Sequence, residues 1–165
     1  MLTQQKIAFK NIILWRHAQA VDAQDTDDVT KDDLARELTQ KGQKQATIMA
    51  NWLAQHKVSN TQLISSEAIR ACQTAQALHS NMLINKAFNP GASLQQVLVA
   101  LHTLDQSQDL ILVGHAPWLG QLATHLLGIN QVEFSIKKGA IWWLRFCGSV
   151  TNNYEILTVQ TCKLL

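Results

Sequence analysis

The stretch IILWRH, residues 12–17, decides how this chain folds. Its four apolar residues, two of them β-branched, are typical of a short buried strand. The strand ends at an arginine and a histidine, and open α/β sheets bind their ligands at the carboxyl ends of their strands. The guanidinium of Arg16 offers a planar set of donors that suits phosphate, and a neutral imidazole at His17 offers a nitrogen nucleophile. Alone, such a pair is more often two solvated loop residues than a site.

Two later segments repeat this arrangement. Residues 63–66 (LISS) predict a second strand followed by a helix, with Ser66 as the expected N-cap and Arg70 one turn further on. Residues 110–113 (LILV) predict a third buried strand, which leads through a glycine to His115. Three strand ends therefore carry basic side chains.

Parallel strands place their carboxyl ends at the same edge of a sheet, so these side chains can converge. We call them the basic set: Arg16, His17, Arg70 and His115. Such a group implies an anionic ligand, and a phosphoryl group carries about −1.5 to −2 charges near neutral pH. Two arginines and two imidazoles can hold its oxygens and leave one imidazole nitrogen free to attack phosphorus.

The motifs around the basic set resemble those of the histidine phosphatase superfamily, the phosphoglycerate-mutase-like group. The resemblance covers about residues 10–160. It rests on residues 16–18 (RHA), 38–46 (LTQKGQKQA), 65–75 (SSEAIRACQTA) and 113–115 (VGH), in that order. A glycine is usual in the family at the position of Ala18, and alanine there would be strained if the backbone needed a positive φ.

The resemblance implies a role for each member of the basic set. His17 would be the nucleophile that accepts the phosphoryl group. Arg16, Arg70 and His115 would bind the phosphate and stabilise the transition state. No cofactor and no metal is implied, because arginines stand where a metal site would have carboxylates.

Length and composition narrow the class of protein. The 165 residues suit one domain, 1–165, and 47% hydrophobic residues suffice for a core. No run of 18 apolar residues is present, and the first ten residues lack a secretory apolar segment. Cys72, Cys147 and Cys162 have no metal-like spacing. With a net charge of +2, we expect a cytoplasmic monomer with free thiols that binds neither membrane nor nucleic acid.

The alternation of apolar strands and amphipathic segments predicts a layered α/β fold. Helices are expected at about residues 39–56, 93–104 and 117–127, and late strands at about 140–146 and 154–160. Together with the resemblance, this predicts a three-layer α/β/α sandwich of the phosphoglycerate-mutase-like type. Its central sheet would be mostly parallel, with a C-terminal antiparallel hairpin and no cap domain.

The sequence offers few general acids. Hydrolysis of a phosphomonoester expels an alkoxide, which a carboxyl group of raised pKa usually protonates. No Asp or Glu occurs between Ala68 and Leu104, and Asp105 and Asp109 are expected at the opposite edge of the sheet. The remaining candidates are Glu67, which is more simply a charge at a helix N-terminus, and an aspartate from residues 22–33. A phosphohistidine substrate relaxes the demand, because its imidazole can leave as a neutral ring.

The short layout resembles the SixA type of protein phosphohistidine phosphatase. The supporting residues are 36–39 (RELT), 50–53 (ANWL), 89–91 (NPG) and 134–141 (FSIKKGAI). The resemblance implies a hydrolase of signal transduction that forms a covalent phosphohistidine. Its substrate would be a phosphohistidine-bearing protein, either a phosphotransfer domain or a phosphocarrier. Arg36, matched by the first of these motifs, is expected to extend the phosphate site.

Two other functions remain open. One is a small-molecule phosphomonoesterase of the same superfamily, with Glu67 or an aspartate of residues 22–33 as the acid. The other is a phospholigand-binding module without turnover. The complete basic set argues against the second, since loss of activity usually removes one of its members.

Overall fold

The computed structural model describes residues 6–23, 33–56, 60–130, 132–148 and 154–165, and these form a mixed six-stranded sheet. Along the sheet the strand order is β3-β2-β4-β1-β5-β6. The strands are β1 (Asn11–Arg16), β2 (Thr61–Ser65), β3 (Leu83–Ile84), β4 (Asp109–Gly114), β5 (Ile141–Phe146) and β6 (Tyr154–Gln160). β3, β2, β4 and β1 run parallel, whereas β5 and β6 are antiparallel to their neighbours. The predicted sheet is confirmed, apart from the short strand β3, which was not predicted.

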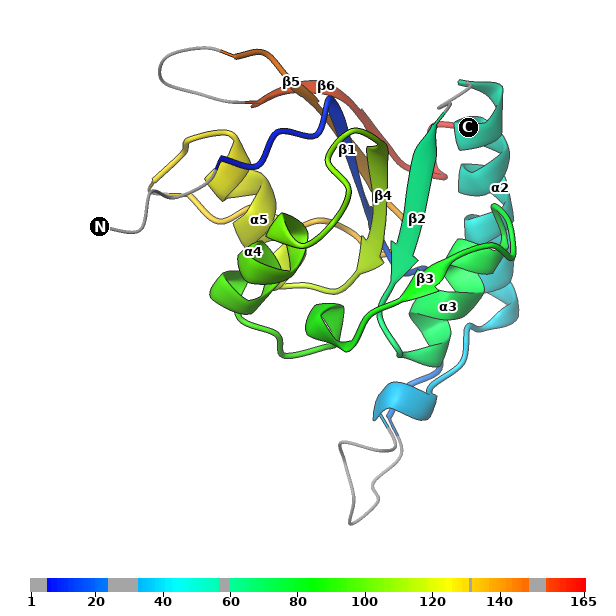
Figure 1. Ribbon diagram of the computed structural model, residues 1–165. Coiled ribbons are helices and arrows are strands. Elements are labelled where there is room, and N and C mark those ends of the chain that lie inside the picture. Colours follow the sequence, from blue (N-terminus) through cyan, green and yellow to red (C-terminus); the bar gives the residue numbers. More distant parts are fainter. Residues whose placement is uncertain (1–5, 24–32, 57–59, 131, 149–153) are drawn as a thin grey trace.

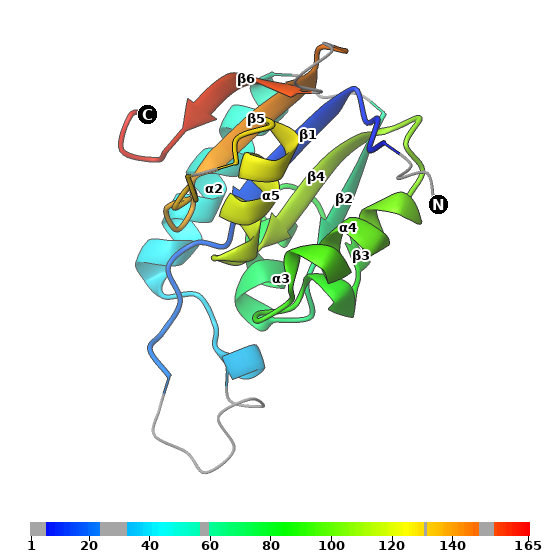
Figure 2. The ribbon, with the colours of Figure 1, turned by 90° about the vertical axis from the view of Figure 1, so that its left-hand side faces the viewer.

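Helices cover both faces of the sheet. They are α2 (Gln40–Gln55), α3 (Ile69–Gln76), α4 (Leu94–His102) and α5 (Trp118–Leu126), with a short 3₁₀ turn η1 (Lys86–Phe88) before α4. Figure 1 shows α2 and α3 on one side of the sheet and α4 and α5 on the other, and Figure 2 shows the same layers after a quarter turn. The predicted three-layer α/β/α sandwich is therefore confirmed.

β1 lies in the middle of the sheet and is buried on both faces. Successive side chains of a strand point to opposite faces. Accordingly, Ile12 and Leu14 pack in the core on the side of α4 and α5, and Ile13 and Trp15 pack in the core on the side of α2 and α3. This double burial explains why the opening stretch is continuously apolar rather than alternating.

The first turns of two helices follow from their sequences. Thr39 caps α2, where its Oγ1 accepts a hydrogen bond of 3.0 Å from the Gly42 N–H. Ser93 and Gln96 form a reciprocal capping box at the start of α4. These two helices begin and end within about two residues of the predicted bounds.

The predicted N-cap role of Ser66 is wrong. Helix α3 follows Ala68, a residue with no side-chain acceptor, and Glu67 precedes the helix instead of lying in its first turn. The reason is that the Ser66 hydroxyl lies 2.7 Å from Nε2 of His115 and so belongs to the site.

None of the helices in the described part of the chain is long and apolar enough to cross a membrane.

Gly114 lets helix α5 pack against the end of β4. A Cβ on Gly114 would lie 2.2 Å from Cζ2 and 2.3 Å from Cη2 of the buried Trp118 ring. Both atoms belong to the outer ring of the indole. Because Gly114 has no Cβ, the indole of Trp118 can pack directly against the backbone at this position, one residue before His115.

Replacing this glycine is expected to destabilise the fold. We predict that Gly114→Ala lowers the free energy of unfolding by about 1–3 kcal/mol, because the core cannot take the extra methyl group. Urea unfolding measures the change. Trp118→Phe shortens the ring, so the double variant should lose clearly less than the sum of the single losses. Strict additivity in this cycle would show that the methyl group does not meet the indole.

Candidate active site

The parallel register brings the three predicted strand ends to one edge of the sheet. Arg16 at the end of β1 is paired with Gly114 at the end of β4. Ser65 at the end of β2 is paired with Val113, one residue before Gly114. The chain continues from these ends into His17, Ser66 and His115. Figure 1 shows β2 and β4 pointing toward this common edge.

A hydrogen bond to the backbone holds His17 in one tautomer. The side chain is only 5% exposed. Its Nδ1 lies 2.8 Å from the carbonyl oxygen of Ala18, which can only accept, so Nδ1 carries the proton. Its Nε2 is then unprotonated, and its lone pair accepts a hydrogen bond of 3.4 Å from Nε of Arg70. Nε2 is therefore the nitrogen of His17 that carries a lone pair.

Ala18 introduces no strain beside His17. Among the described residues, Asn60 is the only non-glycine residue with a positive φ. The N–H of Ala18 donates to Oγ1 of Thr74 over 3.0 Å. Alanine is therefore compatible with the backbone at this position.

His115 faces His17 across the site. Their ring centroids are 5.0 Å apart. His115 is 2% exposed, its Nε2 lies 2.7 Å from Oγ of Ser66, and its Nδ1 lies 3.5 Å from Nη2 of Arg70. A guanidinium can only donate, so in this arrangement Nδ1 accepts and Nε2 donates to the serine. Ser66 thus fixes the orientation of His115.

The two arginines of the basic set have different surroundings. Arg16 donates from Nη1 to the carbonyl oxygen of Ile136 over 2.7 Å, and its Nε is buried without a partner among the described residues. Arg70, the second residue of α3, contacts both imidazoles and is 2% exposed. The structure therefore brings all four predicted residues together, as the sequence suggested.

Burial keeps both imidazoles neutral. Desolvation is the main reason why the pKa of His17 falls to about 3, and the charges of Arg70, Arg16 and Lys138 lower it further while the hydrogen bond to Ala18 opposes them. The pKa of His115 falls to about 2, mainly because the ring is desolvated. The charges of His17 and of the nearby arginines lower it further. Burial also lowers the pKa values of Arg16 and Arg70. Near neutral pH the site thus combines two cations with two uncharged imidazoles.

Asp33 completes the site, and the sequence did not single it out within residues 22–33. Its Oδ2 lies 2.9 Å from Nη2 of Arg70, and its backbone carbonyl accepts from Nη1 of the same arginine. Its Oδ1 accepts from Nε and Nη2 of Arg36 over 3.0 and 2.6 Å. The one available signal was the spacing of Asp33 and Arg36, because residues three apart are neighbours on a helical turn.

Arg36 therefore reaches the basic set through Asp33. Its Nη1 also donates to the carbonyl oxygen of Val21 over 3.0 Å. The pKa of Asp33 is lowered, because hydrogen bonds from Arg70 and Arg36 and their charges outweigh the opposing effect of burial. Asp33 is accordingly an anion near neutral pH.

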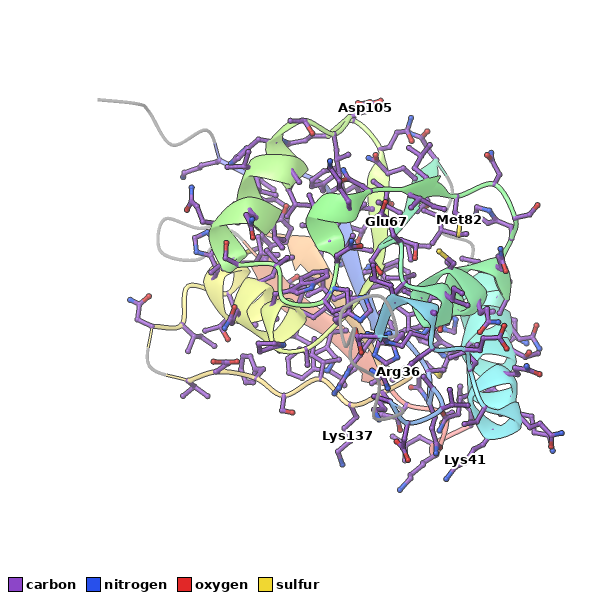
Figure 3. The ribbon with its side chains drawn as sticks, turned by 90° about the horizontal axis from the view of Figure 1, so that it is seen from below. Arg36, Lys41, Glu67, Met82, Asp105 and Lys137 are labelled. Atoms are coloured by element: carbon purple, nitrogen blue, oxygen red, sulfur yellow. The ribbon has the colours of Figure 1, made fainter. Side chains whose placement is uncertain are left out.

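The other candidate acids lie elsewhere. Glu67 is exposed and is paired with Asn89: Oε2 accepts from Nδ2 over 2.7 Å, and the Glu67 N–H donates to Oδ1 over 2.9 Å. Figure 3 shows Glu67 well separated from Arg36. Asp109 begins β4 and accepts from the Asn11 N–H, at the opposite edge of the sheet as predicted. Residues 24–32, with four of the candidate aspartates, lie outside the described residues.

In the described ranges, no three His, Cys, Asp or Glu side chains lie close enough together to hold a metal ion.

Acidification should test the neutral state of the imidazoles. In the unfolded chain a histidine is protonated below about pH 6.5. In the folded site His115 resists protonation down to about pH 2, so the unfolded state binds more protons. Each such histidine should lower the free energy of unfolding by ~1.4 kcal/mol per pH unit below 6.5.

We therefore predict that His115→Gln makes the stability less sensitive to acid. Urea unfolding at pH values between about 6.5 and 5 should give a shallower slope for the variant than for the wild type, since glutamine does not titrate. Parallel slopes would show that His115 is not held neutral by the fold.

Comparisons with known proteins agree with this geometry. Residues 12–91 match the model of the histidine phosphatase superfamily, branch 1. An uncharacterised protein of Picosynechococcus sp. is 30% identical over 142 residues, which cover 81% of this chain and 84% of that protein.

Solved structures of the same fold include several phosphatases. The protein histidine phosphatase SixA complexed with tungstate superposes with a TM-score of 0.77 at 21% identity, over 94% of this chain and 99% of that chain. A phosphoserine phosphatase mutant from Entamoeba histolytica, in complex with phosphoserine, gives a TM-score of 0.66 at 16% identity, over 94% and 99% of the two chains. The chain therefore belongs to the histidine phosphatase superfamily, and it is a phosphatase with a SixA-like fold.

Proposed function

We propose that this phosphatase removes the phosphoryl group from a phosphohistidine of a signalling or phosphocarrier protein. The reaction passes through a covalent phosphohistidine at His17. Arg16, Arg70 and His115 hold the phosphoryl oxygens, and His115 does so by turning its Nε2–H from the Ser66 hydroxyl to an oxygen. The Nε of Arg16, buried without a partner among the described residues, supports this role. The fold shared with SixA agrees with the proposal. Because a phosphoserine phosphatase has the same fold, the fold by itself does not identify the substrate.

One observation carries the choice of substrate. Within the described residues, the carboxylate in contact with the basic set is Asp33, and the arginines keep it ionised. An ionised carboxylate cannot protonate an alkoxide leaving group, and an alkyl phosphate needs such a proton. Phosphohistidine does not, because its imidazole leaves as a neutral ring once its other nitrogen is protonated. The site is therefore suited to a phosphoramidate.

The first step transfers the phosphoryl group to the enzyme. The lone pair on Nε2 of His17 forms a bond to phosphorus while the P–N bond of the substrate breaks, and its electrons return to the departing imidazole. The guanidinium groups of Arg16 and Arg70 stabilise the charge on the phosphoryl oxygens in the transition state. Because the Ala18 carbonyl retains the proton on Nδ1, the phosphorylated His17 ring is cationic.

The second step is hydrolysis of this intermediate. A water molecule attacks phosphorus, the bond to Nε2 breaks, and the electrons of that bond restore the Nε2 lone pair. The proton lost by water leaves with the phosphate. The imidazole of a cationic phosphohistidine is a good leaving group, because it departs as a neutral ring. The Ala18 carbonyl thus favours both formation and breakdown of the intermediate.

Removal of the nucleophile should abolish turnover. We predict that His17→Ala reduces phosphohistidine hydrolysis to background, because the unprotonated Nε2 of His17 is the proposed nucleophile, whereas His115 is held by the Ser66 hydroxyl. Wild-type enzyme quenched during turnover should carry an acid-labile, base-stable phosphoryl label that the variant lacks. His125→Ala, at an exposed position of α5, is the matched control and should retain full activity. A label that survives acid would contradict a phosphohistidine intermediate.

The substrate preference tests the proposal directly. The kcat/KM for a phosphohistidine protein or peptide should exceed that for phosphoserine by about 100-fold or more, the usual contribution of a general acid. Both substrates are compared with one enzyme preparation, and aryl phosphates are avoided because their leaving groups need little protonation. Glu67→Gln should leave the ratio unchanged. Equal hydrolysis of phosphoserine, lost in Glu67→Gln, would establish the phosphomonoesterase alternative.

A further inference from the structure

Four of the five N–H groups of Arg70 have partners among the described residues, and one of these partners is Nδ1 of His115. Nη1 of Arg70 donates to the backbone carbonyl of Asp33, its Nη2 to the carboxylate of Asp33 over 2.9 Å, and its Nε to His17. The side chain of Arg70 is 3% exposed, whereas that of Asp33 is 28% exposed. The carboxylate therefore lies between the guanidinium and solvent.

A phosphoryl group that binds both terminal nitrogens of Arg70 must replace the Asp33 carboxylate on Nη2, because the other N–H of Nη2 faces His115. A carboxylate and a phosphoryl group compete for the same donors, because guanidinium binds either in the same planar manner. Arg36 offers Asp33 an alternative, since it already holds Oδ1 from two nitrogens. Asp33 can thus give up Arg70 and keep a charged partner.

We propose that Asp33 is an internal competitor for the phosphoryl site that weakens the binding of every anion there by a similar factor, so that groups with two negative charges still bind well and groups with one bind poorly. The proposal rests on the phosphatase function inferred above and adds the selection of the bound group. A dianion replaces one negative charge at Arg70 with two and gains electrostatic energy. A monoanion, such as a phosphodiester, only exchanges one single charge for another. Asp33 also favours release of the product, because it can reoccupy Arg70 when phosphate leaves.

Two inert anions separate charge from shape. Tungstate and perrhenate are tetrahedral oxyanions of nearly equal size, with two negative charges and one, respectively. Isothermal titration of the wild type should show that tungstate binds and that perrhenate binds far more weakly. In Asp33→Asn both affinities should rise by about tenfold or more, since both anions displaced the same charge-assisted hydrogen bonds. The two gains should be similar, because the displaced group is the same.

The control removes a like charge from the same segment. Glu37 is exposed and lies four residues after Asp33. Glu37→Gln should change the affinity for either anion by less than about twofold, as expected for a screened surface charge. No gain in Asp33→Asn, or an equal gain in Glu37→Gln, overturns the proposal. So does a gain for tungstate alone, since this would mean that Asp33 repels the ligand without occupying its place.

Two further measurements guard against a folding defect. Asp33→Ser should give the same gains, with circular dichroism confirming the wild-type fold. In the unaltered protein, hydrogen exchange in residues 33–38 should become faster with saturating tungstate, because Asp33 loses Arg70. Slower or unchanged exchange overturns the proposal. These experiments use no phosphohistidine, so they can succeed even if the proposed substrate is wrong, and they can fail while phosphohistidine turnover proceeds normally.

Discussion

The parallel pairing of β1, β2 and β4 is the constraint on which the site depends. Arg16 is opposite Gly114 and Ser65 is opposite Val113, so each strand ends within one residue of its neighbour. Because a shift of one residue would turn every side chain to the other face of the sheet, the buried apolar faces hold this register firmly. Segments far apart in the chain are thereby brought within hydrogen-bond distance, as in the contact between Ser66 and His115.

The burial that secures the register also sets the chemistry of the site. Desolvation keeps His17 and His115 uncharged, whereas the guanidinium groups start from a pKa so high that a lowered value still leaves them cationic. A neutral nucleophile beside fixed cations suits attack on an anionic phosphoryl group. The carbonyl of Ala18 decides which nitrogen of His17 is unprotonated. It can accept only from a protonated Nδ1, so Nε2 keeps its lone pair.

The buried guanidinium of Arg70 needs an anionic partner within the protein to offset the cost of its burial. Asp33 supplies it by bridging Arg70 and Arg36, which explains why an ionised carboxylate lies at the proposed phosphate-binding site. A buried charge without a partner would be costly, so the contact that we propose as the competitor of the phosphoryl group also stabilises the folded protein. Arg36 then takes part indirectly, as the residue that keeps Asp33 paired.

By itself the sequence indicated the layered fold and the strand ends, because continuous apolar runs and helical periodicity are local signals, and the residues that follow those strand ends gave the basic set. Only the tertiary structure decided the contacts among those residues. The Ser66 hydroxyl was expected to cap a helix, but its partner His115 lies 49 positions away. The pair of Asp33 and Arg70 spans 37 positions. β3 gave no signal, since its two residues are exposed. Hydrogen bonds between distant residues leave no periodic trace, so the three-dimensional fold alone could decide them.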